Sequence, residues 1–99
     1  MLFMILAKDK ADSLELRMAN RAAHLEYIKG AGSRIKVAGP LLSGGDEPKP
    51  TGSMIIIDAA SEGAVRLFCD NDPYATAGLF ERVEIQHWLQ VTGEWVPKS

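Results

Sequence analysis

The sequence CDNDPYATAGLF, residues Cys69 to Phe80, carries the most distinctive local signal in the chain, and the elements on either side are arranged around it. Within it, Asp72 stands directly before Pro73. Proline suits the first position of a helix because its φ is fixed and it has no N–H, and a preceding aspartate can cap the free N–H groups. The stretch therefore predicts one short helical turn from Asp72 to about Ala77. Asp72 is either this cap alone or also the partner of a second side chain.

A strong strand pattern lies upstream of this turn, in the sequence GSMIIIDA at residues 52–59. Alternate side chains of a strand point to opposite faces, so Met54 and Ile56 share one face and Ile55 and Ile57 share the other. Both faces are apolar. The sequence does not decide which of the two rows meets the helices.

A helix is predicted between this strand and the turn, over residues 62–71, with Ser61 as its cap. After the turn, alternating apolar and polar residues predict a last strand over residues 79–91. Trp88 falls on the otherwise polar face of that strand.

The N-terminal half repeats the strand-and-helix order. An apolar run predicts a buried strand over residues 1–8, and residues 34–42 begin as a second strand in which Pro40 belongs at a sheet edge or a strand end. Between them, a helix capped by Asp12 or Ser13 carries one apolar stripe, made of Leu14, Met18, Ala22, Leu25 and Ile28. The whole order predicts one α+β domain over residues 1–99: a ferredoxin-like βαββαβ fold, with an antiparallel sheet and both helices on one face.

Composition narrows the class of protein. The net charge is −2 and there is no basic run, so we expect no nucleic-acid partner. The apolar N-terminal run is too short to span a membrane and lacks the pattern of a secretory signal, so a cytoplasmic protein is the default expectation. The single cysteine, Cys69, excludes an internal disulfide and a metal site built on several thiolates, and it reads as a core residue.

Three polar residues, Arg17, Arg21 and His24, fall together on one edge of the apolar stripe of the first helix. Two interpretations stay open. They form either a solvated flank with extended arginine side chains, or the polar wall of a pocket between helix and sheet.

Two helices can cover only one face of the predicted sheet, yet two of its strands are apolar on both faces. Large exposed apolar patches usually mark an interface. We therefore expect a homodimer formed through the open sheet face, with Trp88 near the interface because tryptophan is enriched in such places.

The sequence resembles the YCII-related domain family over nearly its whole length. The matching pieces, in order, are RAAHLEYI (21–28), AGPL (38–41), GSMIIIDA (52–59), DPYATAGLF (72–80) and VEIQHW (83–88). The resemblance implies a dimeric α+β barrel, built from ferredoxin-like subunits. It also implies an active site formed by His24 and Asp72, and one branch of the family is associated with dehydrochlorination of chloroaromatic compounds. The family often has a proline before the tryptophan where this chain has His87.

Such a His–Asp dyad suits proton transfer, because an aspartate that accepts from one imidazole nitrogen leaves the other free as a base. Arg17 and Arg21 could hold an anionic oxygen of a small substrate, and Ser53 and Tyr74 could add hydrogen bonds to it. The reaction would be an isomerisation or a lyase-type elimination. No cofactor motif is present.

A metal site is not expected, because His24 and His87 would need a third ligand that the sequence does not offer. The alternative to an enzyme is a small-ligand-binding or regulatory domain in which His24 and Asp72 form a structural pair.

Overall fold

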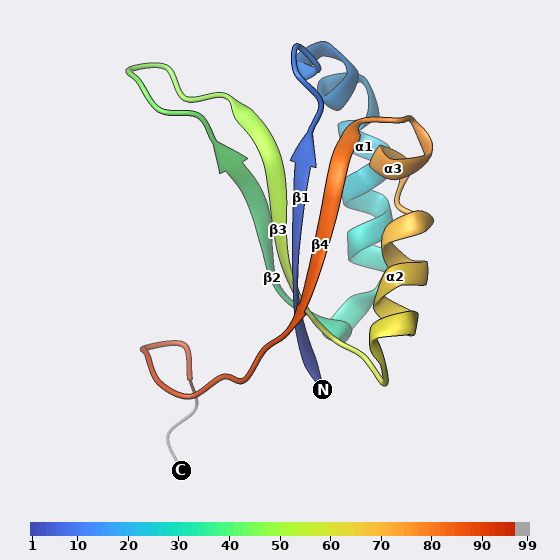
Figure 1. Cartoon of the computed structure of the whole chain (residues 1–99), viewed down its shortest axis with the longest axis vertical. Helices are drawn as coiled ribbons and strands as arrows, with labels where there is room; N and C mark the ends of the chain where they lie inside the picture. Colours follow the sequence, from blue (N-terminus) through green and yellow to red (C-terminus); the bar gives the residue numbers. More distant parts are fainter. Residues whose placement is uncertain (97–99) are drawn as a thin grey trace.

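The sheet has four antiparallel strands in the order β2-β3-β1-β4, as expected for a ferredoxin-like α+β domain. The computed structural model describes residues 1–96. Its strands are β1 (Leu2–Asp9), β2 (Ile35–Leu42), β3 (Pro50–Asp58) and β4 (Phe80–His87). The helices α1 (Leu14–Gly30), α2 (Glu62–Asp70) and α3 (Pro73–Thr76) lie against one face of this sheet, and the short 3₁₀ turn η1 (Gly32–Arg34) follows α1 (Figure 1).

The core lies between the sheet and the helices. Phe3 and Ile5 of β1 pair with Ile57 and Ile55 of β3, and this row packs under the helices. The row is completed by Ile85 of β4, and α2 covers it with Val65, Phe68 and Cys69. The Ile55 and Ile57 row is thus the helix-facing one, and Cys69 is a buried core residue, as expected.

Two helix starts use the caps that the sequence predicted. The hydroxyl oxygen of Ser61 accepts a hydrogen bond from the backbone N–H of Ala64 at 3.1 Å and caps α2. Asp72 caps α3 by accepting from the backbone N–H of Tyr74 at 2.9 Å, with Pro73 in the first turn. The expected turn after Asp72 is therefore this short helix.

Most of the apolar stripe predicted for α1 lies off its contact face, although its last member, Ile28, packs against the core. Leu14, Met18 and Leu25 are exposed, whereas Arg17 and His24 are buried. The reason lies in what α1 meets, because the nearby end of the sheet presents the polar side chains of Asp9 and Ser53 to it. A helix packs the side chains that can satisfy such groups, since a buried polar group without a partner is costly.

The prediction for the last strand was too long, because β4 ends at His87 rather than at residue 91. Trp88 donates its backbone N–H to the carbonyl of Leu2 at 3.0 Å, and Leu2 is the first residue of β1. Beyond it β1 offers no further residues to pair with, so the alternating pattern of residues 89–91 continues without a sheet. Trp88 itself lies one residue past the strand.

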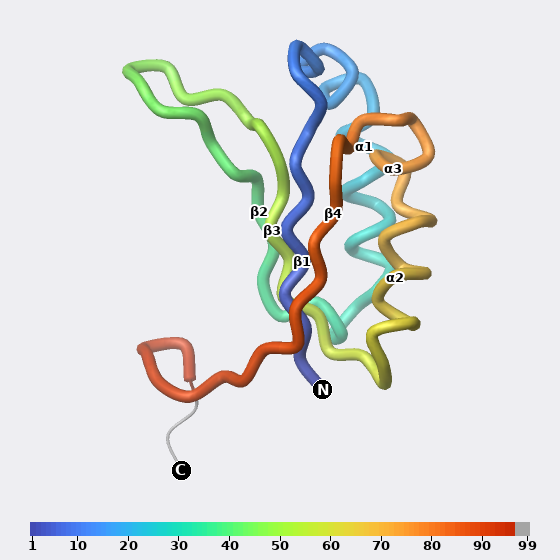
Figure 2. The backbone as a smooth tube through the Cα atoms, in the orientation of Figure 1, coloured from blue at the N-terminus to red at the C-terminus, as the bar shows by residue number. Residues whose placement is uncertain are grey.

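The other face of the sheet carries no helix. Alternation along the strands places the side chains of Leu2, Met4, Leu6, Met54 and Ile56 there, and we call these residues the open face. β2 is the edge strand of the sheet, which agrees with the position expected for Pro40. The hairpin of β2 and β3 extends past the end of the sheet on this side (Figure 2). Within residues 1–96, none of the helices has the length and apolarity needed to cross a membrane.

Candidate functional site

His24 of α1 and Asp72, the cap of α3, are in contact although they lie 48 positions apart in the sequence. The Nδ1 atom of His24 lies 2.9 Å from Oδ1 and 3.0 Å from Oδ2 of Asp72, and both side chains are buried. A carboxylate accepts, so the neutral imidazole carries its proton on Nδ1 and donates it to Asp72. This tautomer leaves a lone pair on Nε2.

The free nitrogen Nε2 of His24 reaches solvent although the residue as a whole is buried. It has no hydrogen-bond partner among the described residues. In the same part of the chain, every side-chain nitrogen or oxygen that is sealed from solvent does have a partner. Nε2 is therefore an accessible proton acceptor at the edge of a rigid pair.

The aromatic ring of Tyr74 packs against the face of the His24 ring. The two rings are stacked, with centroids 4.0 Å apart and planes at 12°. The guanidinium of Arg17 lies over the Tyr74 ring at 4.6 Å from its centroid, and Arg17 precedes His24 by two turns of α1. The Tyr74 ring is thus held between a cation and an imidazole.

The pKa of Tyr74 is raised above its ordinary value, chiefly because burial disfavours the phenolate. The positive charges of Arg17 and Arg21 act in the opposite direction and Asp72 adds to the rise. The Tyr74 hydroxyl therefore stays protonated at neutral pH, which keeps it available as a hydrogen-bond donor.

Arg17 is fixed by two further residues at the end of the sheet. Its Nε donates to Oδ2 of Asp9 at 2.7 Å, and its Nη2 donates to Oδ1 of Asp9 at 3.3 Å and to Oγ of Ser53 at 2.7 Å. The sequence did not single out Asp9, because the first strand was predicted to end at residue 8. Strand alternation was the available signal, because β1 runs on to Asp9 and odd-numbered residues face the helices.

The predicted residues fall into two groups. The structure brings together Arg17, Ser53 and Tyr74 with His24 and Asp72, in one buried network that also includes Asp9. Arg21 is different, since its side chain is exposed and acts on Tyr74 only through its charge. Within residues 1–96, no three histidine, cysteine, aspartate or glutamate side chains are grouped as a metal site would require.

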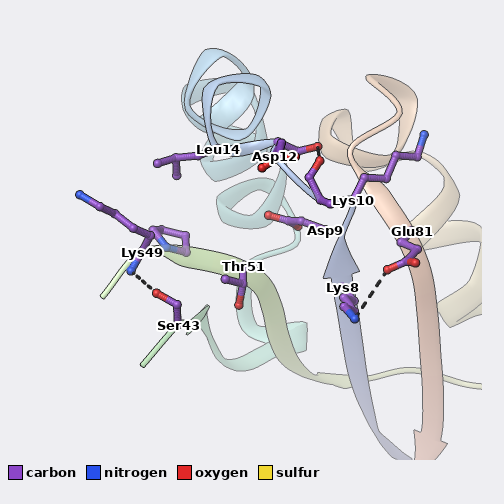
Figure 3. Close-up of a pocket in the computed structure, with 12 residues that line it drawn as sticks. Lys8, Asp9, Lys10, Asp12, Leu14, Ser43, Lys49, Thr51 and Glu81 are labelled. Carbon is purple, nitrogen blue, oxygen red and sulfur yellow. Dashed lines mark hydrogen bonds and ion pairs between the residues drawn. The ribbon is translucent and has the colours of Figure 1, made fainter. Parts of the chain in front are cut away.

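A cavity of about 500 Å³ opens beside this network, between the β1–α1 connection and the base of the β2–β3 hairpin (Figure 3). Asp9 forms part of its wall and connects it with Arg17. The other lining residues include Lys8, Thr51 and Glu81 together with the apolar Leu14 and Pro50. His24 and Asp72 are not among the lining residues, so the cavity reaches the network from its Asp9 side.

Comparison with known proteins gives a consistent result. A family model described as YCII-related domain matches residues 1–89. The protein YciI of Escherichia coli O6:H1 is 37% identical over 97 residues, which covers 92% of this chain and 99% of that protein.

Solved structures agree with this match. The 5-chloro-2-hydroxyhydroquinone dehydrochlorinase of Burkholderia phenoliruptrix AC1100, solved in complex with 2,5-dihydroxybenzoquinone, is 39% identical, with a TM-score of 0.88. That alignment covers 92% of this chain and 96% of the dehydrochlorinase chain. An antibiotic biosynthesis monooxygenase is similar in fold alone, at 11% identity and a TM-score of 0.50 over 91% of this chain and all of the other.

Proposed function

Because this chain belongs to the YCII-related domain family, we propose that it is a small cytoplasmic enzyme that transfers protons on a small anionic or aromatic molecule. His24 is the acid–base group and Asp72 is its orienting partner. One observation carries the proposal: Nδ1 of His24 is bound to both carboxylate oxygens of Asp72 while Nε2 is unbound and reaches solvent. An acceptor held in one orientation beside accessible space is what general-base catalysis requires.

The neighbouring side chains suit a substrate that develops negative charge. Arg17 and Ser53 are already joined by a hydrogen bond, so their donors are held in place before any ligand arrives. Fixed donors stabilise a developing oxyanion more than mobile ones, because they need no reorganisation during the reaction. Tyr74 supplies a protonated hydroxyl, and the exposed charge of Arg21 attracts anions toward this edge.

The similarity to a dehydrochlorinase suggests loss of HCl from a chlorinated, hydroxylated ring as the first reaction to test. With 5-chloro-2-hydroxyhydroquinone, a proton first moves from a ring hydroxyl to the adjacent carbon that bears chlorine. A second hydroxyl then loses its proton, and its electrons pass through a ring double bond to expel chloride. The products are hydroxybenzoquinone and HCl, with no change in total electrons. His24 would move the protons in both steps.

The decisive experiment measures chloride release from 5-chloro-2-hydroxyhydroquinone by the purified chain. We expect turnover that falls by about 10²–10⁴ in His24→Gln, the range usual for a general acid–base group. His87→Gln is the matched control, because His87 is the other histidine and its side chain is exposed at the end of β4. Equal rates in both variants would exclude His24 as the acid–base group.

The second candidate is a binding or regulatory domain without catalysis. It is favoured by the position of the pair, which is buried, ties α1 to α3, and does not line the cavity of about 500 Å³. Titration with 2,5-dihydroxybenzoquinone distinguishes the two candidates. Binding without turnover of the chlorinated compound, unchanged in His24→Gln, would favour this second function.

The proposed active unit is a homodimer formed through the open face. Met4, Leu6 and Met54 are only half-buried there, although they lie in the middle strands of the sheet. Packing two such faces together would remove apolar surface from water on both subunits. Sedimentation should give twice the chain mass of 10.8 kDa.

A further inference from the structure

Asp9, the last residue of β1, has a buried carboxylate that binds a single side chain. Both of its oxygens accept from Arg17, and within residues 1–96 no other hydrogen-bond partner of this carboxylate is found. Only 6% of the Asp9 side chain is exposed. A buried ion pair is often no more stabilising than apolar residues of the same size, so its presence directs attention to what the bound guanidinium does.

The sheet keeps a second carboxylate out of this ion pair. β1 and β4 shift register beside Asp9, so that Asp9 pairs with Phe80 and Glu81 is an extra residue in β4. In an unshifted ladder Glu81 would stand opposite Asp9, on the helix side. The bulge leaves Glu81 on the other face, 3.7 Å from Lys8 (Figure 3). Asp9 therefore has no competing carboxylate from β4.

Three hydrogen bonds to two strands fix the plane of the Arg17 guanidinium. Asp9 of β1 accepts at 2.7 Å and 3.3 Å, and Oγ of Ser53 in β3 accepts at 2.7 Å. Ser53 lies opposite Ala7, two positions before Asp9, so both acceptors stand on the same face of the sheet. A planar guanidinium bound to fixed acceptors at several of its N–H groups is held in one orientation.

The ring of Tyr74 is confined by this guanidinium and by two other rings. The centre of the Arg17 guanidinium lies 4.6 Å from the Tyr74 centroid, and the imidazole of His24 is stacked on the ring at 4.0 Å. Phe80 packs edge-on against Tyr74, with centroids 6.0 Å apart and planes at 81°. Phe80 is the residue that the bulge places opposite Asp9. The position of Tyr74 thus depends on groups that meet at Asp9.

The contact with Asp72 does not by itself fix the position of Nε2 in His24. Asp72 binds the imidazole at one edge atom, Nδ1, and a ring held at one edge can still tilt about that contact. The stacked ring of Tyr74 blocks this tilt. The block matters for chemistry, because displacement of a catalytic group by about 1 Å can cost about 10²-fold in rate.

We propose that Asp9 is a positioning residue for His24. By binding Arg17, Asp9 fixes the guanidinium that holds the Tyr74 ring against the imidazole, and this keeps Nε2 in place for proton transfer. The inference rests on the proposed function and extends it to a residue that does not contact His24.

Proton NMR of the His24 ring measures its stacking directly and needs no substrate. Protons that lie over the face of an aromatic ring resonate upfield, so the stacked Tyr74 should shift the ring protons of His24 upfield. The chain has two histidines, and a His87→Gln background leaves the ring signals of His24 alone. Tyr74→Leu in that background gives the resonance positions without the stacked ring.

Asp9→Asn in the same background keeps the size of the side chain and one acceptor oxygen but removes the charge. We expect the ring protons of His24 to move downfield, toward their positions in Tyr74→Leu. The ring tautomer should stay unchanged, because Asp72 still binds Nδ1. Chloride release should fall by up to about 10²-fold, the usual cost of a misplaced catalytic group.

Two further variants complete the test. Ile85→Val is the matched control, since it removes a buried methyl group from the core on β4 and lowers stability without touching Arg17 or its partners. It should leave both the His24 resonances and the rate unchanged. Ser53→Ala takes the place of Asp9→Asn if that variant does not fold, because it removes one hydrogen bond from Arg17 and keeps the ion pair. It should move the same resonances in the same direction by a smaller amount.

Unchanged His24 resonances in folded Asp9→Asn, or in Ser53→Ala if Asp9→Asn does not fold, would overturn the inference, because the ion pair would then only stabilise the end of the sheet. Shifted resonances with the parent's rate of chloride release would overturn it as well, since the orientation of the ring would not matter to the chemistry. If the parent releases no chloride, the proposed reaction fails, and the ring-proton shifts alone then decide whether Asp9 positions His24.

Discussion

The ring of Tyr74 lies nearly parallel to the imidazole of His24, with 4.0 Å between the centroids and 12° between the planes. Asp72 binds the imidazole edge and also caps the helix that carries Tyr74. One short segment, Asp72 to Tyr74, thus holds the His24 ring in two ways: Asp72 binds its edge and Tyr74 packs on its face. The imidazole is left with little freedom to rotate.

Replacing Asp72 by asparagine should separate its two roles. Asparagine caps about as well as aspartate, so unfolding free energy should change by less than about 1 kcal/mol. The amide oxygen would stay with the N–H of Tyr74, which turns the amide nitrogen toward Nδ1 of His24 and disfavours the proton there. We expect chloride release to fall by about 10² or more, and ¹⁵N NMR of the ring to report a changed tautomer.

Asp70→Asn is the control for this variant. Asp70 is an exposed aspartate at the end of α2, and the substitution makes the same chemical change two residues away. It should leave both the rate and the ring tautomer unchanged. If Asp72→Asn also leaves both the rate of chloride release and the His24 tautomer unchanged, the only role of Asp72 is to cap α3.

Removing one partner of the Asp9–Arg17 ion pair should lower the unfolding free energy strongly. Both side chains are about 95% buried, so Asp9→Leu leaves a buried, uncompensated guanidinium and should cost about 3–5 kcal/mol of unfolding free energy in urea. The double variant Asp9→Leu with Arg17→Met should recover much of that loss, since it removes the unpaired charge.

A neighbouring ion pair supplies the comparison. Lys8 and Glu81 lie 3.7 Å apart, with more than half of each side chain exposed. Lys8→Gln should change stability by less than about 1 kcal/mol, as surface pairs usually do. If Asp9→Leu cost no more than Lys8→Gln, burial would not govern the strength of the Arg17 anchor.

Cys69 should be unreactive in the native protein. Burial raises the pKa of its thiol to about 11, and the thiolate is the reactive form. We expect negligible reaction with a thiol reagent at neutral pH in buffer and rapid reaction in denaturant. Rapid native labelling would contradict the core position of Cys69.

The same shift has a pH consequence of defined sign. A thiol whose pKa is higher in the folded state contributes stability that is complete below the ordinary value of 9.0 and is lost as pH rises toward about 11. Cys69→Ala should therefore lose less stability than the parent over this alkaline range, measured by urea unfolding. Identical losses in the two proteins would show that other groups govern the alkaline limit.

Adjacent residues of β3 should respond in opposite ways to a charge. Ile55 faces the helices and is buried, so Ile55→Lys should prevent folding, as seen by circular dichroism. Met54 is on the open face, so Met54→Lys should fold but sediment as a monomer. A dimeric Met54→Lys variant would place the subunit interface elsewhere.

The fold could be predicted from the sequence because the spacing of apolar residues differs between its helices and strands, and because helix-capping residues mark where helices begin. Ser61 and Asp72 cap the helices that they were expected to cap. The last strand could not be bounded this way, since β4 stops where β1 runs out of residues at Leu2. Alternation records what a strand could bury and contains no information about the length of its neighbour.

The candidate site could be predicted only in part. The sequence marked Arg17 and His24 as polar residues beside an apolar stripe, but their burial depends on the polar side chains that the sheet brings beneath α1. Asp9 was missed because its role depends on a partner eight positions away, on another element. Local patterns identify a residue's own helix or strand and leave its tertiary neighbours undetermined.

The network that holds His24 draws on β1, α1, β3 and α3, and its contacts span up to 48 positions of sequence. Its members run from Asp9 to Tyr74, so binding there is coupled to the folding of most of the domain. A compound present at one hundred times its dissociation constant would add about 2.7 kcal/mol to global stability. In a domain of this size that corresponds to a rise in melting temperature of about 10–20 °C. Thermal melting of the unmodified protein can thus rank candidate metabolites before any reaction is known.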